Sequence, residues 1–246
     1  MINKEVFLLP KRWQLLSGSW LKVIAMVSMA IDHVAGFLMR YHSDFTQPLF
    51  NVGHKQISWC FLMHCIGRLA FPLFAFLLVE GFLHTSNRMK YGRNLLLFAL
   101  LSEIPFDLAR RGSLFAAGQN VFFTLFLGFL ALYAVDRWES GKDSAGRLAV
   151  ILFSLIGIGI LFHTDYGSTG ISFILLLYVL RKNRILQAAI GCCFLGSRWI
   201  AGLAFIPINL YNGRRGFIRG AFGKYLFYVF YPLHLLVIYF IRCMLM

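Results

Sequence analysis

The segment Leu21–Met39, LKVIAMVSMAIDHVAGFLM, is the feature that most constrains this chain. About 20 apolar residues at 1.5 Å per residue span the roughly 30 Å hydrocarbon layer of a bilayer, so the segment predicts a membrane-spanning helix. It nevertheless carries Lys22 at its start and Asp32 and His33 two-thirds of the way along. Ionisable groups at that depth are costly and commonly face a protein interior or a water-filled cavity, so all three are candidates for a functional site.

The spacing of Lys22 and His33 places them on one helix face. They are eleven residues apart, which at about 100° per residue returns to nearly the same face, about 16 Å further along. The alternative is a lysine that extends to the lipid headgroups and a histidine that only hydrogen-bonds a neighbouring helix. Asp32 and His33 diverge by about 100°, so a carboxylate that orients His33 is expected from another helix.

The composition extends this interpretation to the whole chain. Of its 246 residues, 59% are hydrophobic and 14% are charged, and the mean hydropathy is +0.70. Soluble domains are about 45–50% apolar and about 25% charged, so this composition indicates an integral membrane protein. We expect an all-α, polytopic bundle of about eight transmembrane helices, with nine as the alternative. Residues 1–20 would form a basic interfacial arm and residues 21–246 a single transmembrane domain, with the first helix retained because no cleavage signal is visible.

The net charge of +14 comes from short clusters of Lys and Arg between apolar segments, as at residues 88–93, 181–184 and 214–219. The positive-inside rule explains these clusters and favours a protein of the inner membrane with a cytoplasmic N-terminus. Nucleic-acid binding would need a basic face on a folded soluble domain, for which the chain has no room. Membrane lipid is therefore the expected partner, and the sequence leaves the oligomeric state open. It also leaves open the side on which residues 211–224 lie.

Two long apolar segments are each expected to tilt or to break. The segment Ile57–Leu83 is too long for one untilted span, and Gly67 and Pro72 mark possible kinks. The segment Ile185–Leu210 is either one tilted helix or two short helices broken near Gly196. The five cysteines lie in apolar segments without zinc-ligand spacing, and no paired-histidine motif occurs, so no metal site is expected.

Further ionisable residues lie in the later apolar segments, and an inert scaffold would rarely hold so many. They are Arg68, Glu80, Glu103, Asp107 and His234. Arg68 and Glu80 are twelve residues apart, about 18 Å along a helix, so they cannot pair with each other locally. Glu103 and Asp107 share a helix face and could relay a proton or pair with an arginine.

Several motifs resemble the TraX family of membrane proteins, which is linked to N-terminal acetylation of conjugative pilin. In order from about residue 21 to residue 240 they are LKVIAMVSMAIDH, IGRLAFPLFAFLLVEGF, SEIPFDLA, NVFFTLFLG, DYGSTGI and KYLFYVFYPLHLL. The family is similar in turn to the integral membrane acyltransferases of the acyltransferase-3 type, whose first helix carries an Arg, ten residues and then a His. Lys22 and His33 occupy that pattern here, although a lysine lacks the guanidinium fork.

The resemblance implies a membrane acetyltransferase with an acyltransferase-3-like fold. Its donor would be acetyl-CoA and its acceptor the N-terminal amine of pilin or of another cell-surface protein. His33 would be the base or a transient acyl carrier, with Asp32 and Glu103 as further catalytic residues. The groups implied to bind the substrate or CoA are Lys22, Arg68, Glu80, Asn120, Tyr231 and His234.

Two other functions fit the same residues. A proton-coupled transporter could use Asp32, His33, Glu103 and Asp107 as a relay, although the two-fold sequence repeat common in transporters is not visible. A non-catalytic pilus-assembly protein could use the segment around Gly67 only as a packing seam between helices.

Overall fold

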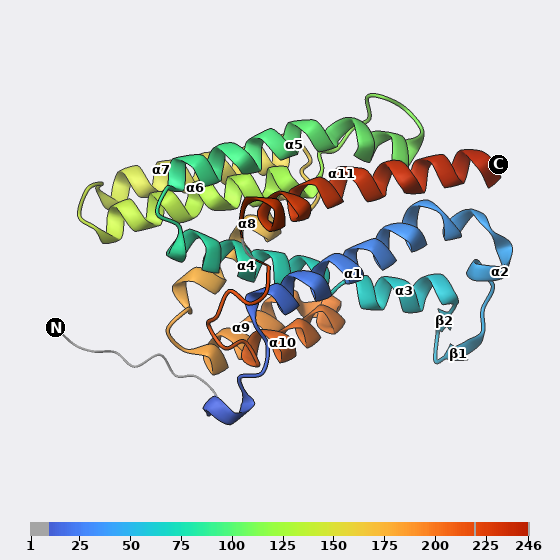
Figure 1. Cartoon of the computed structure of the whole chain (residues 1–246), viewed down its shortest axis with the longest axis horizontal. Helices are drawn as coiled ribbons and strands as arrows, with labels where there is room; N and C mark the ends of the chain where they lie inside the picture. Colours follow the sequence, from blue (N-terminus) through green and yellow to red (C-terminus); the bar gives the residue numbers. More distant parts are fainter. Residues whose placement is uncertain (1–9, 219, 246) are drawn as a thin grey trace. The chain divides into compact units, whose positions relative to one another are not determined.

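The computed structural model describes residues 10–218 and 220–245, and this part of the chain is helical apart from one short hairpin (Figure 1). The expected all-α class is therefore confirmed for the described residues. The hairpin pairs β1 (Phe50–Val52) with β2 (Lys55–Ile57) in antiparallel register. Of the expected N-terminal arm, residues 1–9 lie outside the described residues, and Lys11–Trp13 forms a 3-10 turn, η1.

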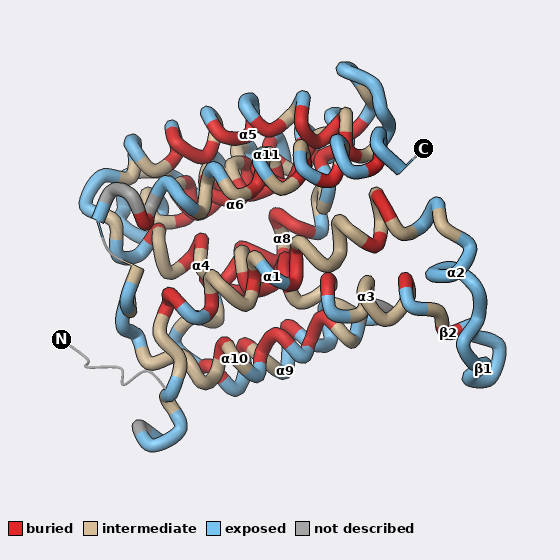
Figure 2. The backbone as a smooth tube through the Cα atoms, turned by 45° about the vertical axis from the view of Figure 1, so that its right-hand side comes forward, coloured by how far each residue is buried: buried red, intermediate tan, exposed pale blue. Residues whose placement is uncertain are grey.

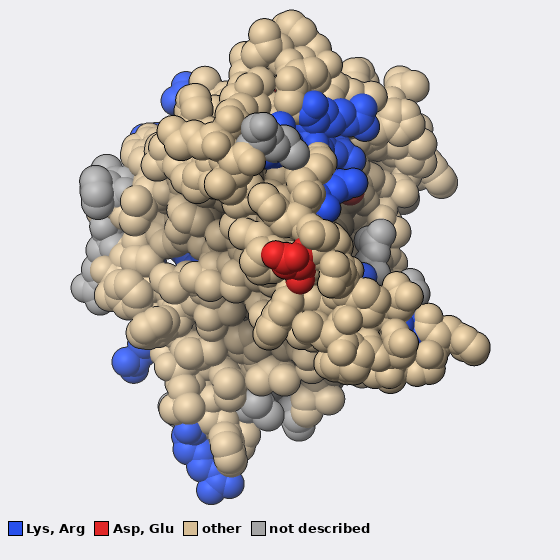
Figure 3. All heavy atoms as spheres, turned by 90° about the vertical axis from the view of Figure 1, so that its right-hand side faces the viewer, with Lys and Arg blue, Asp and Glu red and all other residues tan. Residues whose placement is uncertain are grey.

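The helices follow the predicted apolar segments. Their bounds are α1 Gly18–Phe37, α2 Ser43–Thr46, α3 Trp59–Gly67, α4 Ala70–His84, α5 Arg88–Arg111, α6 Val121–Glu139, α7 Ala145–Leu161, α8 Gly167–Val179, α9 Arg184–Leu195, α10 Phe205–Asn209 and α11 Gly220–Leu245, with 3-10 helices η2 Met39–Tyr41 and η3 Gly196–Ala204. Within the described residues, four stretches are long and apolar enough to cross a membrane: Gly18–Tyr41, Trp59–His84, Val121–Glu139 and Tyr225–Leu245. On one face most surface atoms belong to uncharged residues, and Lys and Arg form a few clusters (Figure 3). Both features fit a membrane protein.

Of the two alternatives, tilt or break, the structure shows a break in both segments. Helix α3 ends at Gly67 and α4 starts at Ala70, with Pro72 in its first turn. Proline is tolerated there because the first N–H groups of a helix have no acceptor within that helix. In the second segment, α9 ends at Leu195 and η3 begins at Gly196, whose left-handed φ of 49° costs glycine little.

The chain divides into two compact units, which are described separately. Unit 1 comprises Ala75–Glu103 and Ala117–Phe194. In it, α6, α7 and α8 pack together around a core of Leu127, Ala131, Leu155 and Ile171, and the α6 backbone is largely buried (Figure 2). Gly128 allows this packing, since a Cβ there would come within 2.4 Å of Ile174.

Unit 2 comprises residues 10–74, Ile104–Ala116 and residues 195–245, and in it α1 packs against α3 and α11. The start of α1 is hydrogen-bonded to the segment that precedes α11. Gly18 N donates to Arg214 O (2.8 Å), Ser19 N donates to Arg215 O (3.0 Å), and Ser19 Oγ accepts from Ile218 N (2.9 Å). Residues 211–218 therefore lie at the end of unit 2 where α1 begins.

Candidate functional site

Two of the predicted site residues form a direct pair in unit 2. His33 on α1 and His234 on α11 approach to 2.7 Å between Nδ1 and Nε2, respectively. Their rings are nearly parallel, with an interplanar angle of 5° and centroids 5.0 Å apart. His234 also forms a 2.8 Å hydrogen bond from Nδ1 to the carbonyl oxygen of Phe230, one turn earlier in α11. The pair therefore joins two helices through residues that are 201 positions apart in the sequence.

The hydrogen bonds assign the proton on each neutral ring. A carbonyl oxygen can only accept, so Nδ1 of His234 carries a hydrogen and its Nε2 is an acceptor. The donor to that nitrogen is then Nδ1 of His33, because a neutral imidazole has one donor and one acceptor nitrogen. Nε2 of His33 consequently has a free lone pair, which can take a proton or attack a carbonyl carbon.

Aromatic side chains surround the pair. Phe37 stacks on His33 at 5.1 Å between ring centroids, and Tyr231, which is buried, meets its edge at 5.9 Å. Phe106 packs against Phe37 at 6.2 Å. The expected proximity of Tyr231 to His234 is also present, with centroids 5.6 Å apart. These rings make the surroundings of His33 largely apolar.

Asp32 faces a different helix, as its divergence from His33 predicts. Its Oδ1 accepts a 2.8 Å hydrogen bond from Nδ1 of His64 on α3, and the two side chains remain 38% and 41% exposed. His33 does not receive the carboxylate that we expected from another helix, because its partner is the His234 imidazole. His64 was not among the predicted site residues, although its position within an apolar segment was an available signal.

One glycine, Gly67, lets α1 and α3 approach closely enough for this contact. A Cβ at Gly67 would lie 2.3 Å from both Cβ and Oδ1 of Asp32. A Cβ at Gly36 would lie 3.4 Å from Cε1 of His64, an ordinary van der Waals contact, so the approach does not depend on Gly36. Small residues at such positions are the usual means by which membrane helices pack at short range.

Two cations of unit 2 are expected to bind the acetyl donor. Lys22 lies near the start of α1, and Arg68 lies at the end of α3. Lys22 places Nζ 5.0 Å from the ring centroid of Phe227 and is close enough to Arg215 for their charges to repel. Arg68 follows the last residue of α3 as its C-cap. Among the described side chains, neither cation has an ion-pair partner.

Asp107 also lies in unit 2, where its Oδ2 accepts from Ala116 N (2.9 Å), whereas Glu103, Asn120 and Glu80 lie in unit 1. Oε2 of Glu103 accepts from Nδ2 of Asn120 (2.5 Å), and this amide also donates to Ala99 O (2.8 Å). Oδ1 of Asn120 accepts from Phe122 N, so Asn120 caps α6 as its sequence position suggested. These two predicted residues therefore contact each other and connect α5 to the start of α6.

Glu80 forms an ion pair with a residue that sequence reasoning did not single out. Its Oε1 accepts from Arg184 at 3.1 Å, and their side chains are only 13% and 10% exposed. Arg184 also donates to Gln187, whose Nε2 donates to Leu177 O. The contact is a buried link between α4, α8 and α9.

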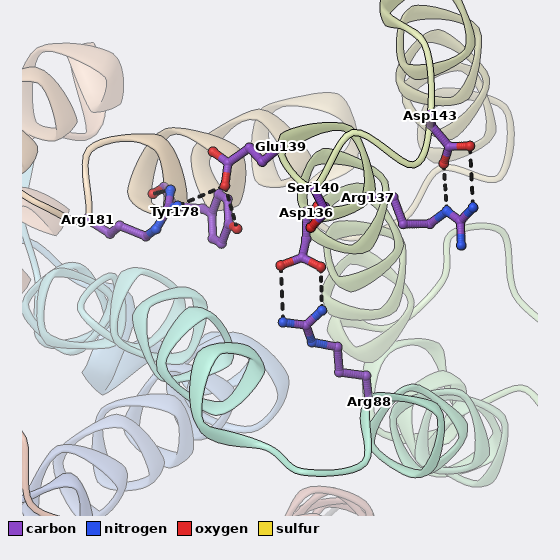
Figure 4. Close-up of polar contacts among 8 residues, drawn as sticks. All are labelled: Arg88, Asp136, Arg137, Glu139, Ser140, Asp143, Tyr178 and Arg181. Atoms are coloured by element: carbon purple, nitrogen blue, oxygen red, sulfur yellow. Dashed lines mark hydrogen bonds and ion pairs between the residues drawn. The ribbon is translucent and has the colours of Figure 1, made fainter. Parts of the chain in front are cut away.

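Three other carboxylates of unit 1, those of Asp136, Glu139 and Asp143, bind arginines near helix ends (Figure 4). Asp136 pairs with Arg88 through both carboxylate oxygens, and Glu139 accepts from Arg181 at 2.9 Å. Asp143 accepts from Arg137 at 2.6 Å, and this hydrogen bond holds the pKa of the Asp143 carboxyl below its usual value. These contacts stabilise loops and leave the histidine pairs of unit 2 as the most reactive groups described.

Comparisons with known proteins agree with the motifs. A family model described as "TraX protein" matches residues 17–242. The probable fimbrial assembly protein FimC, serogroup H1, of Dichelobacter nodosus is 32% identical over 249 residues, which cover 89% of this chain and 93% of that protein. No solved structure matches the chain. The matched region begins one residue before α1 and includes both histidine pairs.

Proposed function

This chain belongs to the TraX family, and we propose that it is a multi-pass membrane acetyltransferase that modifies the N-terminal amine of pilin or of a related cell-surface protein. The name of its relative, a fimbrial assembly protein, supports a pilus-related partner. The resemblance of the family to acyltransferase-3 proteins supports acetyl-CoA as the donor. In the net reaction, the thioester C–S bond breaks, an amide C–N bond forms, and the proton of the amine ends on the CoA sulfur.

The free lone pair on Nε2 of His33 is the observation that carries this proposal. A nitrogen of this kind in apolar surroundings can act directly on the acetyl group or on the attacking amine. Lys22, eleven residues earlier on α1, and Arg68 would hold the phosphates of CoA or polarise the thioester carbonyl. Both cations are suited to this because no described carboxylate neutralises them.

The proposal also includes three residues of unit 1, which are Glu103, Asn120 and Glu80. We propose Glu103 as a further catalytic residue, and Asn120 and Glu80 as groups that bind the substrate or CoA. Their present contacts, Glu103 with Asn120 and Glu80 with Arg184, would also fix these side chains in place. Loss of a contact and loss of a functional group are therefore separable only by measuring both stability and transfer.

The membrane arrangement is part of the same proposal. Beyond the four long helices, we propose that α5 and the four shorter apolar helices also lie within the inner membrane, giving nine spans, the alternative that the sequence left open. The start of α1 would face the cytoplasm, where acetyl-CoA is present. The cations Arg214 and Arg215, which flank the start of α1, support this orientation under the positive-inside rule.

The experiment is intact-mass analysis of a pilin co-expressed with the wild-type chain, with His33→Ala, or with His54→Ala. His54 is an exposed residue of the loop between β1 and β2, so its variant is a matched control. We expect an acetyl increment on pilin with the wild type and with His54→Ala, and none with His33→Ala. Equal membrane levels of the three proteins would exclude a folding defect. Full acetylation in the presence of His33→Ala would remove His33 from the reaction.

A non-catalytic assembly role is the second candidate, favoured by the name of the relative alone. It predicts that pilin has the same mass with and without this protein, while pilus formation still depends on it. The same mass measurement therefore separates the two functions.

A further inference from the structure

Two imidazoles of unit 2, one on α1 and one on α3, have partners that differ in charge. His33 on α1 hydrogen-bonds the neutral ring of His234, whereas His64 on α3 donates from Nδ1 to the carboxylate of Asp32. Asp32 directly precedes His33 in α1, so this 2.8 Å contact brings His64 to the same turn of α1 as His33. Because a carboxylate accepts and does not donate, Nε2 of neutral His64 also has a free lone pair. Two basic nitrogens of different character therefore lie near one another.

The partners decide which ring can hold a positive charge. An imidazole that takes a proton becomes a cation, and an adjacent carboxylate stabilises that cation and fixes the ring orientation. His64 has this carboxylate, and with 41% of its side chain exposed it is also partly solvated. His33 has aromatic neighbours and a neutral partner, so a lasting positive charge on it would be costly. His33 is suited to act as a neutral nucleophile, and His64 as a base.

We propose that the two pairs divide the acetyl transfer, with His33 as the nucleophile and His64, oriented by Asp32, as the base for the acceptor. This inference rests on the proposed function. In the first step, Nε2 of His33 attacks the thioester carbon, the C–S bond breaks, and the Nδ1 proton of His33 moves to Nε2 of His234. The products of this step are a neutral acetylimidazole on His33, a protonated His234 and the CoA thiolate.

In the second step, the acceptor amine attacks the acetyl carbon and the bond from this carbon to His33 breaks. Nε2 of His64 takes the proton released by the amine, and Asp32 stabilises the resulting imidazolium. As its bond to the acetyl carbon breaks, His33 regains its Nδ1 proton from His234, and His64 releases the proton of the amine, which balances the CoA thiolate, so all three imidazoles regain their starting forms. Asp32 is a positioning residue in this scheme, since it acts on the acceptor only through His64.

The scheme predicts that two activities separate. The first is exchange of labelled CoA into acetyl-CoA without any acceptor, which needs only the His33 step. The second is acetyl transfer to a peptide with the N-terminal sequence of pilin, which needs both steps. Both would be measured on the full chain in detergent, with wild type, His64→Gln, Asp32→Asn, His33→Gln and the surface control His54→Gln.

We expect His64→Gln to lower peptide transfer by about 10²- to 10⁴-fold, the usual contribution of a general base, and to leave CoA exchange within about twofold of wild type. Asp32→Asn should show the same separation with a smaller loss. His33→Gln should lose both activities, and His54→Gln should lose neither.

Three results would overturn the inference. Equal losses of exchange and transfer in His64→Gln would indicate a structural role. Unchanged transfer in His64→Gln would exclude it as the base. Absence of exchange in a wild-type protein that acetylates the peptide would exclude the covalent step while leaving the proposed function intact. A wild type without peptide transfer would instead contradict the proposed function itself.

Discussion

Replacing Gly67 by alanine tests whether the close approach of α1 and α3 is required. The new Cβ would lie 2.3 Å from Cβ and Oδ1 of Asp32 and 2.6 Å from its Cγ, whereas non-bonded carbon atoms prefer about 3.5–4.0 Å. The Cβ of Asp32 is fixed to the α1 backbone, so the two helices would have to separate by more than 1 Å at this point. Such overpacking costs about 1–3 kcal/mol. Alanine gains at most about 1 kcal/mol over glycine in a helix, so the expected net effect is destabilising.

Gly157→Ala is the matched control. Gly157 lies inside α7, and a Cβ there would meet no atom within 4 Å, so alanine should stabilise the protein by up to about 1 kcal/mol. Thermal unfolding of both variants in the same detergent would measure the difference. Gly67→Ala should also lower acetyl transfer, because the clash involves the Asp32 oxygen that accepts from His64. A Gly67→Ala protein as stable as Gly157→Ala would refute the close packing on which the Asp32–His64 pair depends.

Three further predictions follow from single contacts. Glu80→Gln should lower the free energy of unfolding by about 3–5 kcal/mol, because it leaves the buried guanidinium of Arg184 without its counter-ion; an unchanged melting temperature would contradict this. Folding lowers the pKa of the Asp143 carboxyl below its ordinary value of 3.8, so the ionised carboxylate stabilises the folded state fully above pH 3.8 and less as the pH falls below it. The free energy of unfolding, measured against pH in acid, should therefore change less in Asp143→Asn than in the wild type. Lys22→Arg should retain acetyl transfer and Lys22→Glu should lose it, whereas equal rates would mean that Lys22 only reaches the headgroups.

Local features of the structure were predictable from the sequence. Length and hydropathy predicted where the helices lie, because a membrane helix satisfies its backbone within a single apolar segment. The break after Gly67 followed from the proline and glycine nearby, and the divergence of Asp32 and His33 followed from helix geometry alone. Each of these inferences uses residues within one or two helical turns of each other.

The pairing of side chains between helices was not predictable. The sequence gives the depth of an ionisable residue but not its neighbour, so His33 could have met a carboxylate as readily as an imidazole. His64 was overlooked because no spacing marks it, and its partner Asp32 lies 32 residues earlier. Arg184 was assigned to a surface cluster of cations, yet packing between α4 and α9 buries it against Glu80.

The register of the two central histidines follows from the loop that joins the starts of their helices. Hydrogen bonds from Gly18 and Ser19 to residues 214 and 215 hold the beginning of α1 beside the segment that leads into α11 at Gly220. Both helices thus start from the same end of unit 2 and run in the same direction. His33 lies fifteen residues after Gly18 and His234 fourteen after Gly220, or about 22 Å and 21 Å at 1.5 Å per residue. The anchored loop therefore brings both imidazoles to one depth, and lengthening it would separate them without altering either helix.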